Sequence, residues 1–227
     1  LNANGQVYLI NPNGILFGNG AQVNVGGLVA SALSVSDDLL NKGLPGVAGD
    51  KLSFAWDGDA LGFANGFVAV DPGARITTAS GSRVVLLAPK TLENLGLIET
   101  GAGGEAILAA GGSVLLTAPA DPNLRGMLVE VKSWKGVDKQ GNSVTLDGSV
   151  TNKTSGTLLA DDGSAIEPDG TPETTPDPYS GTLDAPDGVV TLAALAVNQQ
   201  GTVRAGMAFN LNGEIMLVAG VTETPRL

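Results

Sequence analysis

Cysteine and histidine are both absent from this 227-residue chain. Their absence excludes disulfides, the usual zinc sites, nucleophile–histidine pairs and the side chain that normally titrates near neutral pH. No apolar run approaches the roughly 18 residues that a membrane-spanning helix needs. Most enzyme chemistry and a transmembrane segment are therefore excluded before any motif is considered.

Positive charge is also scarce. Lys and Arg total 12 against 23 Asp and Glu, which gives a formal net charge of −11. Such a chain repels phosphate backbones and anionic lipids, so we expect no nucleic-acid partner. The lack of Cys fits a cytosolic protein, and it equally fits an exported chain that crosses an oxidising periplasm. Because no Met, basic segment or apolar leader precedes Leu1, we expect a fragment that lacks its own start.

Helical periodicity is weak, and short strands dominate the pattern. Alternating or apolar runs of four to six residues are bounded by Gly, Pro and Asn, which favours strands joined by turns. These runs are Gln22 to Val25, Phe67 to Val70, Arg83 to Ala88, Ala106 to Ala110, Val114 to Thr117, Val189 to Leu192 and Ile215 to Val218. The sequence predicts an all-β chain.

An internal repeat organises these strands. An offset of 22 residues aligns "ITTASGSRVVLLA", from Ile76, with "IETGAGGEAILAA", from Ile98, and places Val85 on Ile107 and Leu86 on Leu108. Fainter copies follow, since Val203 echoes Ile98 and "GEIMLVAG" at 213–220 echoes "GEAILAAG" at 104–111. Short strands with Gly corners at this period predict stacked coils of parallel strands, about 4.8 Å apart.

Three segments depart from the repeat. The range 155–188 holds five of the 12 prolines and eight acidic residues, and we interpret it as a solvated acidic insertion. The range 36–66 mixes a leucine pair with Gly, Pro and Asp, and predicts one helical turn or an added hairpin. The range 132–146 has hairpin character. We expect one domain over 1–227 with these three excursions.

The most distinctive turn is Asn11-Pro12-Asn13-Gly14, which lies between the apolar runs "VYLI" and "ILFG". Pro12 sets φ for the second turn position, Asn13 tolerates the third, and Gly14 accepts whatever dihedral leads out. Taken alone, these four residues predict a well-formed hairpin or coil corner. Their contribution is the shape of the backbone rather than a reactive group.

The surroundings of this corner resemble a known family. The stretch "NGQVYLINPNGILFGNGAQVNVGGLVAS", residues 4–31, resembles the secretion domain of the filamentous haemagglutinin family, the exoproteins of two-partner secretion. The stretches "LENLGLIETGAGGEAILAAGGSVLL" and "AVNQQGTVRA" are similar to the family's haemagglutination-activity domain. The resemblance covers roughly two thirds of the chain, and what it misses is mainly the acidic insertion.

The resemblance implies a fold, a location and a partner. The implied fold is a right-handed, single-stranded parallel β-helix with loops and hairpins outside it, at the amino end of a longer secreted or surface adhesin of a Gram-negative bacterium. The implied partner is an outer-membrane transporter with periplasmic POTRA modules, and the missing downstream region would bind host-cell or bacterial surface ligands. No cofactor, metal or catalysis is implied.

The family motif matches this chain residue by residue. It falls on Asn11, Pro12, Asn13, Gly14 and Ile15, which family members use for secretion and folding. The family also carries an earlier motif of similar shape, which would lie before Leu1. A pre-bent corner suits a chain that leaves the cell without ATP and is drawn forward by folding, coil upon coil.

Two other function classes remain open from the residues. Parallel β-helices also host polysaccharide-acting enzymes, for which Asp37-Asp38 or Asp161-Asp162 would be the acid and base, although we interpret both pairs as solvated loop carboxylates. The domain could alternatively bind glycans or host cells itself. Cleavage of polysaccharides would indicate the first class, and direct glycan binding the second.

Three weaker features complete the sequence reading. The range 161–187 is rich in oxygen ligands but has neither calcium-loop spacing, so we assign no calcium site. Trp56 and Trp134 either stack on a sugar or partner, or cover an excursion on the flank of the coil, and we favour the second interpretation. The single sequon, Asn152-Lys153-Thr154, is near the chance expectation and is not treated as a site.

Overall fold

The computed structural model describes residues 1–35, 43–44, 49–56, 66–121, 126–137, 141–154, 158–159, 165–166, 179–205 and 214–219. Within these ranges the chain forms strands and no helix, so no described helix could cross a membrane. The strands in chain order are β1 (Asn2–Ile10), β2 (Ile15–Phe17), β3 (Gln22–Ser31), β4 (Ser34–Val35), β5 (Lys51–Ala55), β6 (Phe67–Val70), β7 (Arg75–Thr78), β8 (Arg83–Ala88), β9 (Thr91–Asn94), β10 (Leu97–Glu99), β11 (Glu105–Ala110), β12 (Ser113–Thr117), β13 (Leu128–Lys132), β14 (Trp134–Val137), β15 (Ser143–Leu146), β16 (Ser149–Lys153), β17 (Leu158–Leu159), β18 (Ala165–Ile166), β19 (Thr182–Asp184), β20 (Val189–Ala194), β21 (Ala196–Gln200), β22 (Thr202–Arg204) and β23 (Glu214–Ala219).

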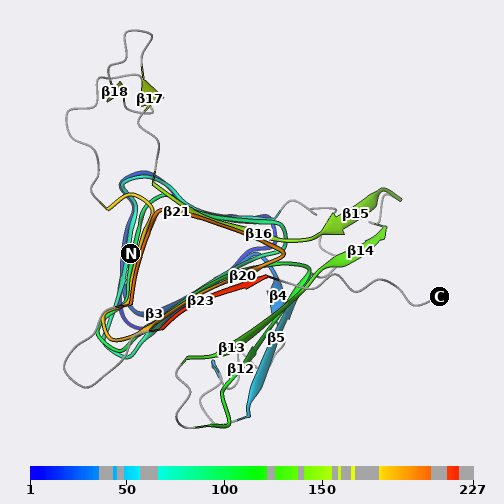
Figure 1. Cartoon of the computed structure of the whole chain (residues 1–227), viewed down its shortest axis with the longest axis horizontal. Helices are drawn as coiled ribbons and strands as arrows, with labels where there is room; N and C mark the ends of the chain where they lie inside the picture. Colours follow the sequence, from blue (N-terminus) through cyan, green and yellow to red (C-terminus); the bar gives the residue numbers. More distant parts are fainter. Residues whose placement is uncertain are drawn as a thin grey trace.

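The main body is a coil with three faces, which form the sides of a triangle in Figure 1. Face 1 stacks the starts of β1 and β3 with β7, β10, β19 and β22. Face 2 stacks the ends of β1 and β3 with β8, β11, β20 and β23, and face 3 stacks β2, β6, β9, β16 and β21. All pairs within the three faces are parallel.

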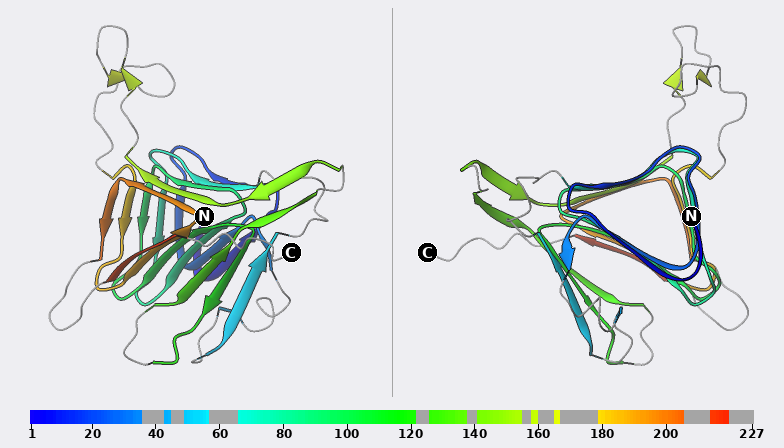
Figure 2. Two further views of the ribbon diagram at one scale, coloured as in Figure 1. Left: turned by 45° about the vertical axis from the view of Figure 1, so that its right-hand side comes forward. Right: turned by 180° about the vertical axis from the view of Figure 1, so that it is seen from behind.

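These strands form six successive coils. Coil 1 consists of β1 and β2, coil 2 of β3 and β6, and coil 3 of β7 to β9. Coil 4 consists of β10, β11 and β16, coil 5 of β19 to β21, and coil 6 of β22 and β23. In Figure 1 the chain runs counterclockwise from face 1 to face 3, and the rear view in Figure 2 brings coil 1 to the front. The chain therefore advances toward the viewer of Figure 1 as a right-handed parallel β-helix.

The register confirms the sequence repeat. Ile76 lies opposite Ile98, and Val85 and Leu86 lie opposite Ile107 and Leu108, as the offset of 22 residues predicts. The two weaker sequence repeats also correspond to strands stacked in register. Leu183 of coil 5 lies between Ile98 and Val203, and β23 stacks on β20 at the register that aligns it with β11.

Face 2 is buried on both of its sides, which explains its continuous apolar runs. Leu86 and Leu108 point into the coil, where they join the interior core. Val85 and Ile107 point outward and join a second core. This second core is closed by an antiparallel sheet in the order β13-β12-β5-β4, the cover sheet, which lies beside face 2 in Figures 1 and 2.

The structure corrects the predicted limits of two excursions. The range assigned to the acidic insertion extended to residue 188, but β19 lies in face 1 between β10 and β22. The reason is that "GTLDAPDG" keeps a coil strand and a Gly corner despite its acidic residues. The second excursion is longer than 132–146, because β12 and β13 also leave the coil and join the cover sheet.

The other predicted excursions are described in part. Within 132–146, β14 and β15 pair antiparallel and extend away from the coil in Figure 1. Within 36–66, β5 pairs antiparallel with β4 and β12. Within 155–178, β17 and β18 pair with each other. The rest of these ranges lies largely outside the described residues.

Candidate functional site

The corner at residues 11–14 is a turn closed by one side chain. The amide N–H of Gly14 donates to the carbonyl oxygen of Asn11 over 3.0 Å, which closes the turn. The side chain of Asn11 then bonds at both ends: its Oδ1 accepts from the N–H of Asn13 over 3.1 Å, and its Nδ2 donates to the carbonyl oxygen of Gly14 over 2.9 Å. All three bonds are local, so the corner can form without the rest of the domain.

The same corner is tied to the next coil. The N–H of Asn11 donates to the carbonyl oxygen of Ser31 over 3.0 Å, at the end of β3. Ser31 is fully buried, and its Oγ bonds to both the N–H and the carbonyl oxygen of Leu33. The corner of coil 1 therefore lies at the point where coil 2 leaves the body for its first excursion.

Position 14 has two requirements that glycine meets and an amino acid with a Cβ does not. Its φ is +121°, a region that side chains with a Cβ rarely adopt. A Cβ built there would lie 2.7 Å from Cε1 of Phe67, because the ring of Phe67 in β6 covers the corner. The identity of this residue is thus set both by its backbone dihedral and by Phe67, a neighbour that is distant in the sequence.

The chain returns from its first excursion onto this corner. Gly66 precedes β6, and a Cβ built on it would lie 2.6 Å from the carbonyl oxygen of Pro12 and 3.0 Å from Cγ of Pro89. Gly66 is therefore enclosed between the corner of coil 1 and the corner of coil 3. Ile15 then lies opposite Val68 in the parallel pair of β2 and β6 and packs against the interior core.

The corner offers a backbone shape rather than reactive chemistry, because none of its five residues carries an ionisable group. The five predicted residues lie at the junction of faces 2 and 3. The excursions that follow β3 and β11 depart from the same junction. Sequence reasoning missed Gly66 and Phe67, which complete the site. The sequence did indicate a coil strand here, since Gly66-Phe67-Val68 repeats the Gly-x-apolar pattern that begins other coil strands. Nothing in the local sequence indicated that this strand contacts the corner at residues 11–14.

The two tryptophans contact each other. The ring centroids of Trp56 and Trp134 are 4.4 Å apart with planes tilted by 60°, so the end of β5 is braced against the start of β14. Gly112 and Gly136 leave room for Trp134, since a Cβ on either would overlap it. This contact supports the interpretation that the tryptophans cover the excursions on the flank of the coil.

A buried amide ladder runs along face 3. Asn94 and Asn152 are opposite each other in β9 and β16 and are fully buried, and Nδ2 of Asn94 donates to Oδ1 of Asn152 over 2.8 Å. Asn152 is also the sequon residue, so the folded chain offers no accessible acceptor there. Asp37, Asp38, Asp161 and Asp162 lie outside the described residues, and no metal-ligand cluster occurs within the described ranges.

The chain folds as a right-handed, single-stranded parallel β-helix with a cover sheet on one face. The chain belongs to the TPS secretion domain family, whose model matches residues 1–165. It is thus a secretion-recognition domain of a two-partner secreted exoprotein, which is exported and then released or displayed on the cell surface. This finding confirms the resemblance recognised from residues 4–31.

A solved structure shares the fold. The HMW1 secretion domain from Haemophilus influenzae matches with a TM-score of 0.61 and 19% sequence identity, over 98% of this chain and 46% of that chain. At this identity the likeness concerns the fold alone, and the chain spans a little under half the length of that structure. No curated protein matches the chain.

Proposed function

We propose that residues 1–227 act as one secretion domain that a partner outer-membrane transporter recognises through its periplasmic POTRA modules. The chain passes through the periplasm before it folds, and its corner at Asn11–Gly14 starts folding as the amino end emerges outside the cell. The domain leads a larger adhesin-type exoprotein and performs no catalysis. Downstream regions of that exoprotein carry the host-cell or bacterial surface ligands.

The observation that carries this proposal is that the corner combines local hydrogen bonds with contacts to a strand that is distant in the sequence. The turn closes with three hydrogen bonds among residues 11 to 14, so it forms as soon as those residues emerge. The return of the chain at Gly66 and Phe67 is non-local. Closing the loop from Ser31 to Phe67 costs about 3 kcal/mol of chain entropy before any contact compensates.

A pre-formed corner reduces the search that this closure requires. It presents the carbonyl oxygen of Pro12 to Gly66, and its Gly14 accepts the ring of Phe67, so the returning strand meets a fixed surface. Once β6 pairs with β2, each further coil adds hydrogen bonds and an apolar layer to the one before it. Stepwise folding of this kind can draw a chain outward without another energy source.

Two features of the described residues support the proposal that the domain performs no catalysis. Glu105 and Asp184 are engaged in ion pairs, Arg83–Glu105 at 2.9 Å and Arg204–Asp184 at 3.8 Å. The distinctive motif holds only amides, Pro, Gly and Ile. These observations support a domain whose work is done by folding.

Secretion of corner variants tests the proposal. The exoprotein is co-expressed with its cognate transporter, and the amount outside the cell is measured for wild type and for Asn11→Ala, Asn13→Ala. The double variant loses both side-chain bonds of the corner and is expected to reach the medium at a small fraction of the wild-type amount. A matched control is Asn19→Ala, which alters the turn of Gly18 to Ala21 at another corner of coil 1. Equal export of the double variant and the control contradicts the role of the corner.

A further inference from the structure

The sequence contains several Asn–Gly pairs, of which the described residues include Asn4–Gly5, Asn13–Gly14 and Asn19–Gly20. Such a pair can modify itself without an enzyme. The backbone nitrogen of the glycine attacks Cγ of the asparagine side chain, ammonia leaves, and a succinimide ring forms; water then opens the ring to aspartate or isoaspartate. Glycine permits this ring because it has no Cβ and restricts the backbone least. The reactivity of each pair therefore depends on how the structure holds the glycine nitrogen.

The Asn19–Gly20 pair forms the tip of the turn that joins β2 to β3. The N–H of Ala21 donates to the carbonyl oxygen of Gly18 over 2.9 Å, which places the pair at the two central positions of the turn. Gly20 has a φ of +73°, as the third residue of a type II turn requires. Both residues of the pair are exposed, and the N–H of Gly20 donates to no acceptor within the described part of the chain. The attacking nitrogen need not leave a hydrogen bond with any of these residues before it reacts.

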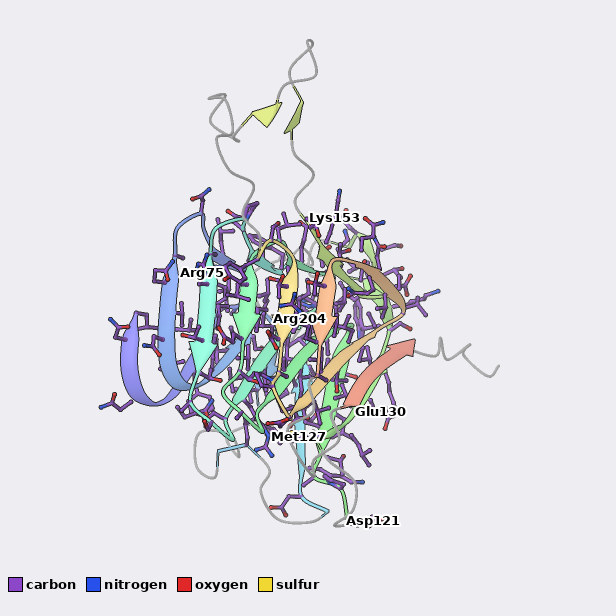
Figure 3. The ribbon with its side chains drawn as sticks, turned by 60° about the vertical axis from the view of Figure 1, so that its left-hand side comes forward. Arg75, Asp121, Met127, Glu130, Lys153 and Arg204 are labelled. Carbon is purple, nitrogen blue, oxygen red and sulfur yellow. The ribbon has the colours of Figure 1, made fainter. Side chains whose placement is uncertain are left out.

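The two reacting atoms of this pair lie on the same side of the turn. A Cβ built on Gly73, in the next coil, would lie 3.7 Å from Cγ of Asn19 and 3.6 Å from the backbone nitrogen of Gly20. The electrophilic carbon and the nucleophilic nitrogen thus face the same neighbour. In Figure 3 this neighbouring turn directly precedes the labelled Arg75, near the upper end of the face 1 strands. Because a Cβ built on Gly20 has no atom within 4 Å, the turn tip has room for the rotations that close the ring.

The Asn13–Gly14 pair of the corner is held differently. The N–H of Gly14 donates to the carbonyl oxygen of Asn11 over 3.0 Å, and the side chain of Asn11 bonds to both residues of the pair. The nitrogen of Gly14 must leave its hydrogen bond before it can attack Asn13, so the reaction requires the corner to open. Asn4–Gly5 lies within β1 rather than in a turn, so the two turn pairs form the matched comparison.

We propose that Asn19 is a site of self-modification in the folded domain, whereas the closed corner protects Asn13. The nitrogen of Gly20 forms a bond to Cγ of Asn19 as ammonia leaves, and hydrolysis of the succinimide leaves isoaspartate or aspartate. The product introduces a carboxylate into residues 1–36, which carry no charged side chain. Modification therefore accumulates with the age of a folded domain, at the corner of coil 1 where face 3 meets face 1. The reaction needs neither a transporter nor export, so its outcome is independent of the secretion role proposed for Asn11–Gly14.

Peptide mass spectrometry of the full 227-residue chain tests the proposal. The folded chain is incubated in mildly alkaline buffer, samples are digested at acidic pH, and the exchange of the amide NH2 for OH is quantified at Asn13 and Asn19. We expect Asn19 to react at least about tenfold faster than Asn13, because only the open fraction of the corner can react. In urea the two rates should become similar, since the corner is then open in every molecule. An isoaspartate-specific methyltransferase identifies the isoaspartate product.

The next coil supplies a control variant. The turns Gly18–Ala21 and Asp71–Ala74 lead into β3 and β7, whose first residues are paired. Pro72 therefore stands at the position of Asn19, and Gly73 follows it with a φ of +76°. Asn19→Pro should keep the turn, leave Tm unchanged or slightly higher, and remove the acidic species that ion-exchange chromatography resolves in the aged chain. An undiminished amount of that species would assign the reaction to another residue and contradict the proposal.

Opening of the corner provides the converse test. Asn11→Ala removes both side-chain bonds of the corner and should accelerate modification of Asn13 severalfold, while the rate at Asn19 stays unchanged. An Asn13 that reacts as fast as Asn19 in the folded wild-type chain would overturn the proposal. So would an Asn19 that reacts more than about tenfold more slowly in the folded chain than in urea, because the folded turn would then protect it as well.

Discussion

Replacement of Gly14 by Ala is the sharpest structural test of the corner. The added methyl group incurs two separate costs. A φ of +121° strains any residue with a Cβ by about 1–3 kcal/mol. The Cβ would also lie 2.7 Å from Cε1 of Phe67, and forcing that ring aside costs about 1–3 kcal/mol more. We expect Gly14→Ala to lower the free energy of unfolding by about 2–6 kcal/mol, which lowers Tm by about 4–24 °C.

A double-mutant cycle separates the two costs. Phe67→Ala removes the ring, so in that background Gly14→Ala retains the dihedral strain and loses the steric part. The losses of unfolding free energy in the two single variants should therefore sum to about 1 kcal/mol or more above the loss in the double variant. Urea unfolding followed by tryptophan fluorescence supplies the four free energies.

The control for this cycle is Gly5→Ala. Gly5 has ordinary φ and no atom within 4 Å of a built Cβ, so its replacement should change stability by about 0.5 kcal/mol or less. Additive effects of Gly14→Ala and Phe67→Ala would show that the ring does not cover the corner. The account of how β6 docks would then be wrong.

Two further predictions concern the buried ladder and the tryptophan pair. Asn152→Ala leaves Nδ2 of Asn94 without its 2.8 Å acceptor in the coil interior, and we expect a loss of about 2–4 kcal/mol by urea unfolding; a change within error would show that the ladder contributes nothing. A cycle of Trp56→Ala and Trp134→Ala should give a coupling energy of about 0.5–1.5 kcal/mol, because the rings lie 4.4 Å apart; zero coupling would show that the two excursions are not braced there.

The coil itself was predictable because its information is local and repeated. The offset of 22 residues placed Ile76 on Ile98 and Leu86 on Leu108, and the structure has this register. All seven predicted strand segments are strands. In a stacked coil each residue repeats the environment of its counterpart one coil earlier, so the sequence carries the same preference several times.

The cover sheet was not predictable by the same means. The segment Val114 to Thr117 looks like any coil strand, but it pairs antiparallel with β5, about 60 positions earlier in the chain. One signal was present: face 2 strands such as "RVVLLA" are apolar without alternation, which indicates burial on both sides. Their sequence could not say which segment covers the outer side.

The corner was predictable in its turn chemistry and unpredictable in its partners. Pro12 and Gly14 predict a turn, and in the structure the side chain of Asn11 closes it. Gly66 and Phe67 reach it only after the first excursion, so their roles depend on tertiary packing. The positive φ of Asp187 was not predictable for a related reason. Gly81 and Gly103 occupy the same position in the two preceding coils, and this correspondence is seen only in the folded coil.

Pulsed hydrogen exchange during refolding of the 227-residue chain tests the central claim most directly. The account holds that the corner forms first and that coil 2 docks on it before later coils assemble. It predicts that the amides of Gly14 and Asp71, whose acceptors are Asn11 and Phe17, gain protection before those of β11 and β20. Earlier protection of β11 and β20 would place the start of folding in coils 4 and 5 and contradict the account.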